Sequence, residues 1–248
     1  MSRFGGNQEP RWAAGYQGMS VAEAPAETRA DFIRKTYLHL VGAVLALVGL
    51  EALLFAVVPR DAQFAVINAL GQTPAMWLLV LGGFVVVSFV ADRIARSATA
   101  PPMQYGGLLL YVVAEAAILF PMLVVAAWWS PPGTIGSAAL VTAIMFTGLT
   151  VFAFVTRADF SWLRGILTVA SFAAIALIVA GAVFRFEMGL WFVVPMIALA
   201  CGAILYQTSA LIHEYQPGQH VAAALALFAS VALLFWYVLR LVMSLQRN

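Results

Sequence analysis

Residues 105–129 read YGGLLLYVVAEAAILFPMLVVAAWW, a stretch in which Glu115 is the single charged residue. A helix crosses the hydrocarbon core of a membrane when about 20 consecutive residues are predominantly apolar. The stretch exceeds that length, and the two tryptophans at its end are typical of a membrane–water interface. We therefore predict a transmembrane helix here, and the same composition recurs along most of the chain.

The whole chain has the composition of a polytopic membrane protein. Of its 248 residues, 63% are hydrophobic and 10% are charged, and its mean hydropathy is +0.95. A soluble domain has about 45–50% apolar and about 25% charged residues, and a disordered chain has low hydrophobicity. Both classes are therefore excluded. Abundant alanine, valine and leucine, with arginine favoured over lysine, indicate a bacterial protein, so we expect multi-pass insertion into the plasma (inner) membrane.

Seven apolar stretches are long enough to cross a bilayer. Turns rich in proline and charge separate them, such as residues 59–61 and 131–132. The expected spans are Tyr37–Val58, Pro74–Ala91, Tyr105–Trp129, Thr134–Val155, Gly165–Phe184, Gly189–Leu205 and Val221–Met243. The connections are short, so we expect an all-α fold with one seven-helix transmembrane domain over residues 31–248. A flexible polar cytoplasmic tail over residues 1–30 is expected to precede it.

The distribution of lysine and arginine predicts the orientation of the bundle. Nine basic residues fall on the side of the N-terminus and four fall on the other side. The nine are Arg3, Arg11, Arg29, Arg34, Lys35, Arg93, Arg96, Arg157 and Arg164, and the four are Arg60, Arg185, Arg240 and Arg247. This excess predicts a cytoplasmic N-terminus. A re-entrant last segment would instead return Arg240 and Arg247 to the cytoplasm.

Glu115 and Glu51 are candidates for an ion pathway, because a charged group inside a bilayer is costly without a role or a partner. Glu115 lies ten residues into its span, which is about 15 Å along a helix and near the midplane. It is either an ion or proton site or a protonated side chain bonded to a neighbouring helix. Glu51 lies about two-thirds of the way along the first span and is expected to reach an aqueous vestibule. His213 and His220 are candidates for pH sensing, because histidine titrates near neutral pH.

Motifs of common enzymes and of seven-helix photoreceptors are absent from the chain. The patterns H-E-x-x-H, G-x-S-x-G, Walker and Rossmann do not occur. Lys35 is the single lysine and precedes the first span, whereas a retinal protein needs a lysine in its last helix. The single cysteine, Cys201, excludes a disulfide framework and a cysteine-based zinc site. The net charge of +2 gives no footprint of nucleic-acid binding, so we expect neither enzymatic activity nor a cofactor, and the sequence identifies no metal ligands.

Four stretches carry a resemblance to a known family. They are DFIRKTY (31–37), YVVAE (111–115), FTGLTVFAFVTRADFS (146–161) and ILYQTSALIH (204–213). Together they resemble the Bax inhibitor-1 family, also called the transmembrane BAX inhibitor motif family, over about residues 31 to 243. The resemblance implies a bundle of six helices around a central seventh. It also implies a cation leak, chiefly for calcium, that responds to pH.

The chain departs from the family at the residues that carry this response. The resemblance implies two aspartates, on the sixth and seventh helices, that share a proton and form a latch. Here Gln207 occupies the first position and Ser230 the second, and no aspartate or glutamate occurs from residue 215 to 248. The family latch also engages an arginine of the second helix, for which Arg93 and Arg96 are the candidates. The carboxyl latch is therefore lost, although Gln207 and Ser230 can still hydrogen-bond across the helices without titrating.

These departures shape the functional hypotheses. Any pH response must come from Glu115, Glu51 or the histidines His213 and His220. The leading hypothesis is a calcium or other cation leak channel without the di-aspartyl latch. The alternative is a membrane interaction protein that binds and regulates a membrane protease or another membrane partner, as some relatives in the family do. A proton-coupled small-molecule transporter with Glu115 as carrier is a third hypothesis, but no inverted repeat supports it.

Overall fold

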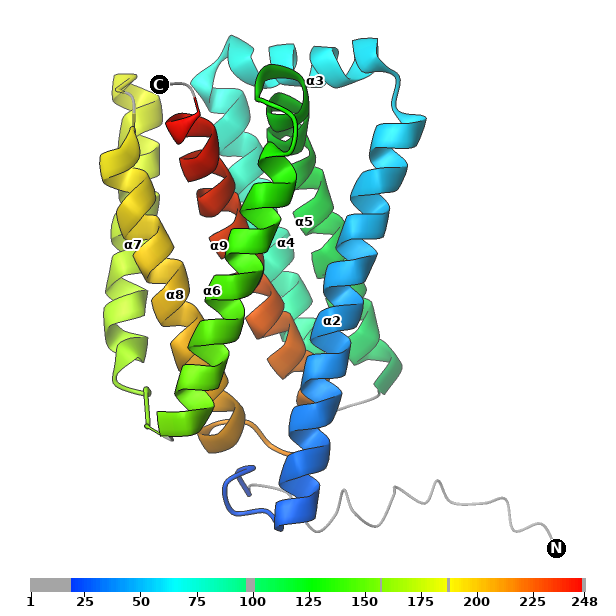
Figure 1. The fold of residues 1–248 in the computed structure, drawn as a ribbon, viewed down its shortest axis with the longest axis vertical. Coiled ribbons are helices and arrows are strands. Elements are labelled where there is room, and N and C mark those ends of the chain that lie inside the picture. Colours follow the sequence, from blue (N-terminus) through cyan, green and yellow to red (C-terminus); the bar gives the residue numbers. More distant parts are fainter. Residues whose placement is uncertain (1–18, 97–100, 157, 187, 247–248) are drawn as a thin grey trace, which may run out of the picture.

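The computed structural model describes residues 19–96, 101–156, 158–186 and 188–246 of the chain. This described part is all-helical (Figure 1). Its eight helices are α2 (Ala26–Val57), α3 (Arg60–Gln72), α4 (Pro74–Ala95), α5 (Pro101–Trp129), α6 (Thr134–Thr156), α7 (Leu163–Phe184), α8 (Leu190–His213) and α9 (His220–Leu245). All except α3 are long and apolar enough to cross a membrane. The predicted all-α fold with seven spans is therefore confirmed.

Two spans extend beyond their predicted bounds. Helix α2 begins at Ala26 rather than Tyr37, so it includes the last part of the predicted tail, and residues 1–18 of that tail lie outside the described part. Helix α8 continues through His213 rather than ending near Leu205. In the part of α8 beyond the predicted end, Thr208 and Ser209 are buried. Burial of small hydroxyl side chains thus lets the helix continue.

Helix α3 was not predicted, because a short connection was expected between the first two spans. It lies across one end of the bundle (Figure 1). The buried Gln63 side chain accepts a hydrogen bond from Trp128 Nε1 at 2.9 Å and donates one to the Val58 carbonyl at 2.9 Å. The Arg60 guanidinium lies 4.2 Å above the Trp128 ring. Helix α3 therefore packs on the end of α5. Apolar residues at positions 64, 67 and 70 are the sequence pattern that indicates this helix.

Helix α9 forms the centre of the bundle, as the family resemblance implied. It packs against α2, α4, α5, α6 and α8, whereas α7 packs mainly against α8 and α4. It runs through the bundle and ends on the same side as α3, opposite the start of α2 (Figure 1). The last segment therefore runs the length of the bundle instead of re-entering, and Arg240 lies toward the end that carries α3.

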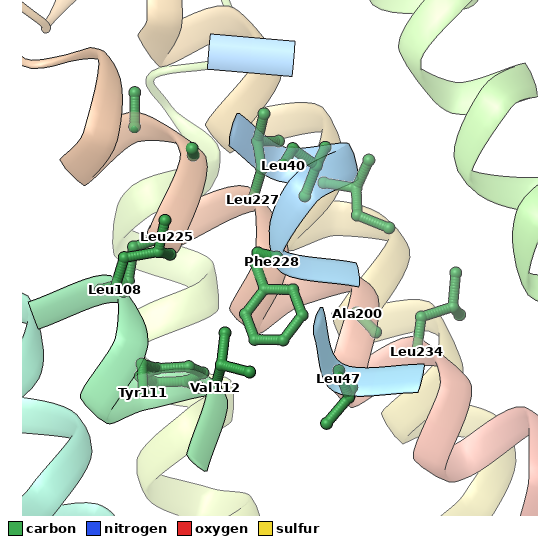
Figure 2. Packing of buried hydrophobic residues seen from close by; sticks show 14 of the residues in the cluster. Leu40, Leu47, Leu108, Tyr111, Val112, Ala200, Leu225, Leu227, Phe228 and Leu234 are labelled. Carbon is green, nitrogen blue, oxygen red and sulfur yellow. The ribbon is translucent and has the colours of Figure 1, made fainter. Parts of the chain in front are cut away.

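The core forms where apolar stripes of α2 and α5 meet α9. On α2 the buried residues are spaced by three and four, which places them on one face of the helix: Phe32, Thr36, Leu40, Ala43, Leu47 and Glu51. Figure 2 shows Leu40 and Leu47 of α2, Tyr111 and Val112 of α5, and Phe228 of α9 in this core. The Tyr111 and Phe228 rings meet edge to face with their centroids 5.8 Å apart. This stripe carries Glu51 into the core.

Helices α4 and α5 approach most closely at Gly107. A Cβ atom at that position would lie 2.6 Å from the Ala91 carbonyl oxygen and 2.7 Å from the Ala95 nitrogen, both in the backbone of α4. At the adjacent Gly106, an added Cβ would meet nothing within 4 Å. The absent side chain of Gly107 therefore sets the distance between the two helices.

A short segment before α2 is fastened to the connection between α8 and α9. The Val21 amide donates to the Tyr215 carbonyl at 2.9 Å, and the Ala22 amide donates to the Ile212 carbonyl at 2.8 Å. The Val21 side chain is fully buried. The start of the described chain is thus part of the packed structure at this end of the bundle.

Candidate functional site

A cavity of about 660 Å³ lies beside α9, between α4, α5, α7 and α8. Aromatic and aliphatic side chains form most of its wall. Its polar lining residues are Ser88, Asp92, Arg96, Tyr111, Glu115, Gln207, Ser230, Tyr237 and Arg240. Four of the predicted site residues therefore share one space: Glu115, Gln207, Ser230 and Arg96. The cavity lining does not include Glu51, Arg93, His213 or His220.

Glu115 occupies the middle of the cavity wall on α5. It is the fifteenth of the 29 residues of that helix, and its residue surface is 5% exposed. Tyr111 lies one helical turn earlier, with its hydroxyl close to the Glu115 carboxyl. A buried carboxyl at mid-height in a cavity of a membrane-spanning bundle is a group that attracts a cation or a proton.

Glu51 lies in the protein interior, not at an aqueous vestibule as predicted. Its residue surface is 6% exposed, and both carboxyl oxygens are buried without a hydrogen-bond partner among the described residues. It faces inward because it continues the buried stripe of α2. It lies close enough to Glu115 for the charge of one carboxyl to act on the other. Sequence spacing alone did not reveal this neighbour.

Gln207 and Ser230 line the same cavity, but they do not form the cross-helix hydrogen bond that was considered possible. The Ser230 hydroxyl donates to the Ala226 carbonyl of its own helix at 3.1 Å. A serine inside a helix often bonds the carbonyl four residues earlier, which satisfies its only donor. The two positions for which the family resemblance implied aspartates are therefore neutral here and not joined to each other within the described structure.

Arg96, rather than Arg93, faces the cavity. Its Nε donates to Asp92 Oδ2 at 2.8 Å and to Oδ1 at 2.9 Å, and its Nη2 lies 3.5 Å from the Tyr215 hydroxyl. Burial disfavours the charge, but the hydrogen bonds with Asp92 outweigh it and hold the pKa of the guanidinium above its ordinary value. Burial also raises the pKa of Tyr215. One end of the cavity thus carries a fixed ion pair, which the spacing of four residues between Asp92 and Arg96 could have predicted.

The two predicted pH-sensing histidines lie apart from the cavity and from each other. His213 ends α8, and its Nδ1 lies 3.0 Å from the Ser209 carbonyl. His220 begins α9 and faces His39 of α2, with ring centroids 5.0 Å apart. His39 Nε2 in turn lies 3.1 Å from the Tyr105 hydroxyl of α5. The sequence did not indicate His39 as the partner of His220, because the spacing of two distant histidines carries no sign of contact.

With this geometry in place, comparison with known proteins decides the family. The sequence profile described as "Inhibitor of apoptosis-promoting Bax1" matches residues 29–248. The chain belongs to the Bax inhibitor-1 family. Bax inhibitor 1 of Schizosaccharomyces pombe is 27% identical over 233 residues, which cover 92% of this chain and 82% of the relative. An uncharacterized protein of Pseudomonas aeruginosa is 31% identical over 109 residues, which cover 43% of this chain and 48% of the relative.

Membership of the Bax inhibitor-1 family and the seven apolar helices together establish a multi-pass membrane protein. Three of the stretches that resemble the family also contribute residues that meet away from the cavity lining. The buried hydroxyls of Tyr37, Thr150 and Thr208 come from three of these stretches, on α2, α6 and α8, and lie close together. The Phe160 amide of the third stretch donates to Ser209 Oγ of the fourth at 3.0 Å. In this member of the Bax inhibitor-1 family, these motif residues join helices to one another.

Proposed function

We propose that this protein is a cation leak channel, with calcium as the chief ion, that works without the di-aspartyl latch of its family. The observation that supports the proposal is the position of Glu115. It is a buried carboxyl at the middle of a membrane-spanning helix, and it faces a cavity of about 660 Å³ inside the bundle. A small ion needs such a space, and a hard cation prefers carboxylate oxygens.

The charges along the cavity favour a slow leak over a fast pore. Near one end, Asp92 is neutralised by Arg96, and near the other end Arg240 contributes to the wall. Gln207 and Ser230 offer neutral oxygen atoms between them. Glu115 therefore supplies the unpaired negative charge of the cavity lining. With one unpaired carboxyl in the cavity, cations pass slowly, because the ion loses water of hydration and gains few protein ligands in return.

The proposed leak is tested by calcium flux into liposomes that contain the purified full chain. We expect flux in the wild type, increasing from about pH 6 to about pH 8 because a carboxyl attracts cations in its deprotonated form. Glu115→Gln is expected to reduce the flux by about tenfold or more, the effect of removing the one ionised ligand. Glu27→Gln is the matched control, since Glu27 is exposed on the first turn of α2.

The outcomes separate the functional hypotheses. Flux that is lost with Glu115→Gln and retained with Glu27→Gln supports the leak. Equal flux in all three proteins contradicts a role for Glu115. Absence of flux from folded wild-type protein contradicts the leak itself and favours the alternative, a membrane interaction protein that acts on a protease or another membrane partner.

A further inference from the structure

We propose that Glu51 and Glu115 form a paired-carboxyl site, between α2 and α5, that binds a calcium ion in exchange for a proton. The proposal rests on the proposed leak for the route by which the ion reaches Glu115. It adds a second ligand on a different helix, α2, whose residues do not line the cavity that Glu115 shares with Gln207.

The first observation is the state of the Glu51 side chain. Both of its oxygens are covered by protein, and neither accepts a hydrogen bond from any described group. Burying a polar group without a hydrogen-bond partner destabilises the folded protein. A chain that keeps such a group in its core retains a strong hydrogen-bond acceptor that no described group uses.

The second observation is that the two glutamates lie at the same height. Helices α2 and α5 run in the same direction, since His39 contacts Tyr105 near one end and Phe55 contacts Phe120 further along, with ring centroids 5.3 Å apart. Counting from either contact places Glu51 level with residues 116–117 of α5. Each residue rises about 1.5 Å along a helix, so Glu51 and Glu115 differ in height by roughly one or two such steps. Glu115 lines the cavity, and it is also close enough to Glu51 for the two charges to interact.

The third observation is the scarcity of charged neighbours. On α2, no ionisable residue lies between His39 and Glu51, and on α9 none lies between His220 and Tyr237. The uncharged polar groups that share the cavity lining with Glu115 include the hydroxyls of Tyr111 on α5 and Ser88 on α4 and the amide of Gln207 on α8. The Arg96 guanidinium is engaged by Asp92. The positive charge of α9 that lines the same cavity as Glu115 is Arg240, ten residues beyond Ser230 and so about 15 Å further along the helix.

The chemistry of the pair follows from its two like charges. Two adjacent buried carboxyls do not both ionise easily, so the empty pair holds one proton between them and carries one negative charge. Calcium binds carboxylates in monodentate or bidentate geometry and accepts neutral oxygen atoms as additional ligands. When a calcium ion enters, the shared proton leaves to water, and the two carboxylates balance the two charges of the ion. The Tyr111 hydroxyl adjoins the same site.

The test is labelling of the full chain in liposomes with dicyclohexylcarbodiimide, which reacts with protonated carboxyls in apolar surroundings. Mass spectrometry then locates the modified residues. We expect modification of Glu51, of Glu115, or of both, and we expect calcium to suppress it. Glu115→Gln should abolish the protection of Glu51 by calcium, and Glu51→Gln should abolish the protection of Glu115. Glu27→Gln should change neither.

The outcomes distinguish this site from the leak. Labelling that calcium does not suppress, or no labelling at either position, overturns the paired site, and calcium flux that persists at the wild-type level in Glu51→Gln overturns it as well. If calcium suppresses the labelling of the wild type but the wild type shows no calcium flux, the paired site is supported and the leak is contradicted. If the paired site and the leak are both correct, Glu51→Gln should reduce calcium flux by about tenfold, comparable to the reduction for Glu115→Gln.

Discussion

On the α2–α5 flank of the central helix, Glu51 and Glu115 lie buried, and Glu51 has no hydrogen-bond partner. On the α8 flank, the amide of Gln207 and the hydroxyl of Ser230 line the same cavity as Glu115 without carrying a charge, and the Ser230 hydroxyl bonds its own helix. A side chain that satisfies itself locally costs little and does not respond to ions or pH. A carboxyl that lacks a local partner responds to both. The comparison therefore indicates which flank of α9 can sense an ion.

The largest expected effect is on the stability of the contact between α4 and α5 at Gly107, because α5 carries Glu115. Gly107→Ala should destabilise the protein by about 1–3 kcal/mol, the usual cost of overpacking, because the new methyl group would meet the backbone of α4. Thermal unfolding in detergent measures this effect. Gly106→Ala is the matched control and should leave the unfolding temperature unchanged. Equal unfolding temperatures for the two variants would contradict the close approach at Gly107.

Carboxyl groups introduced at positions 207 and 230 should make calcium flux more strongly dependent on pH. The double substitution Gln207→Asp and Ser230→Asp puts two acids in the cavity, where one proton is shared at low pH and mutual repulsion follows at high pH. We expect calcium flux to become steeper with pH, changing by about tenfold between pH 6 and pH 8. The neutral pair Gln207→Asn and Ser230→Thr is the control. A double-aspartate protein with the wild-type pH profile would show that the two positions do not communicate.

A smaller effect is expected from the hydroxyl beside Glu115. Tyr111→Phe removes an oxygen atom and keeps the ring that packs on Phe228. A hydrogen bond in a protein contributes about 1 kcal/mol, so the apparent calcium affinity, read from the concentration dependence of flux, should fall by about threefold to fivefold. Tyr105→Phe removes a hydroxyl from the same helix away from the cavity and should not change it. An unchanged affinity in Tyr111→Phe would place that hydroxyl outside the ion site.

The smallest effect is expected at the serine of the neutral flank. Ser230→Ala removes a hydroxyl that bonds only the carbonyl of Ala226 within its own helix. The change in unfolding free energy should stay within about 0.5 kcal/mol, and flux and its pH dependence should match the wild type. Measurements of both in the same preparation check this. A loss of flux in Ser230→Ala would show that the two flanks are not chemically separate.

Much of the fold could be predicted from local composition. The lengths of the apolar stretches define the seven spans, because a bilayer imposes a minimum length on any helix that crosses it. Helix α3 was missed since its apolar residues recur at three-residue spacing within a short polar stretch. The extension of α8 was missed since Gln207, Thr208 and Ser209 are polar, and only their neighbours show that Thr208 and Ser209 are buried.

The candidate site was predictable residue by residue but not as an arrangement. Glu115 follows from its position in a span, and the neutral residues Gln207 and Ser230 follow from the family resemblance. The burial of Glu51 depends on which face of α2 meets α5, and the contact of His220 with His39 joins residues far apart in the chain. Such pairings are set by tertiary packing, which leaves no local pattern in the sequence.

The attachment of the segment before α2 has a mechanical consequence. Val21 and Ala22 hold the connection between α8 and α9 through two backbone hydrogen bonds. Tyr215 in that connection lies against Arg96, with the guanidinium 5.6 Å above its ring, and Arg96 lines the cavity. Any force that lifts this segment either breaks both hydrogen bonds or carries Tyr215 with it. The start of α2 is therefore mechanically coupled to one end of the cavity, although α2 itself does not line that cavity.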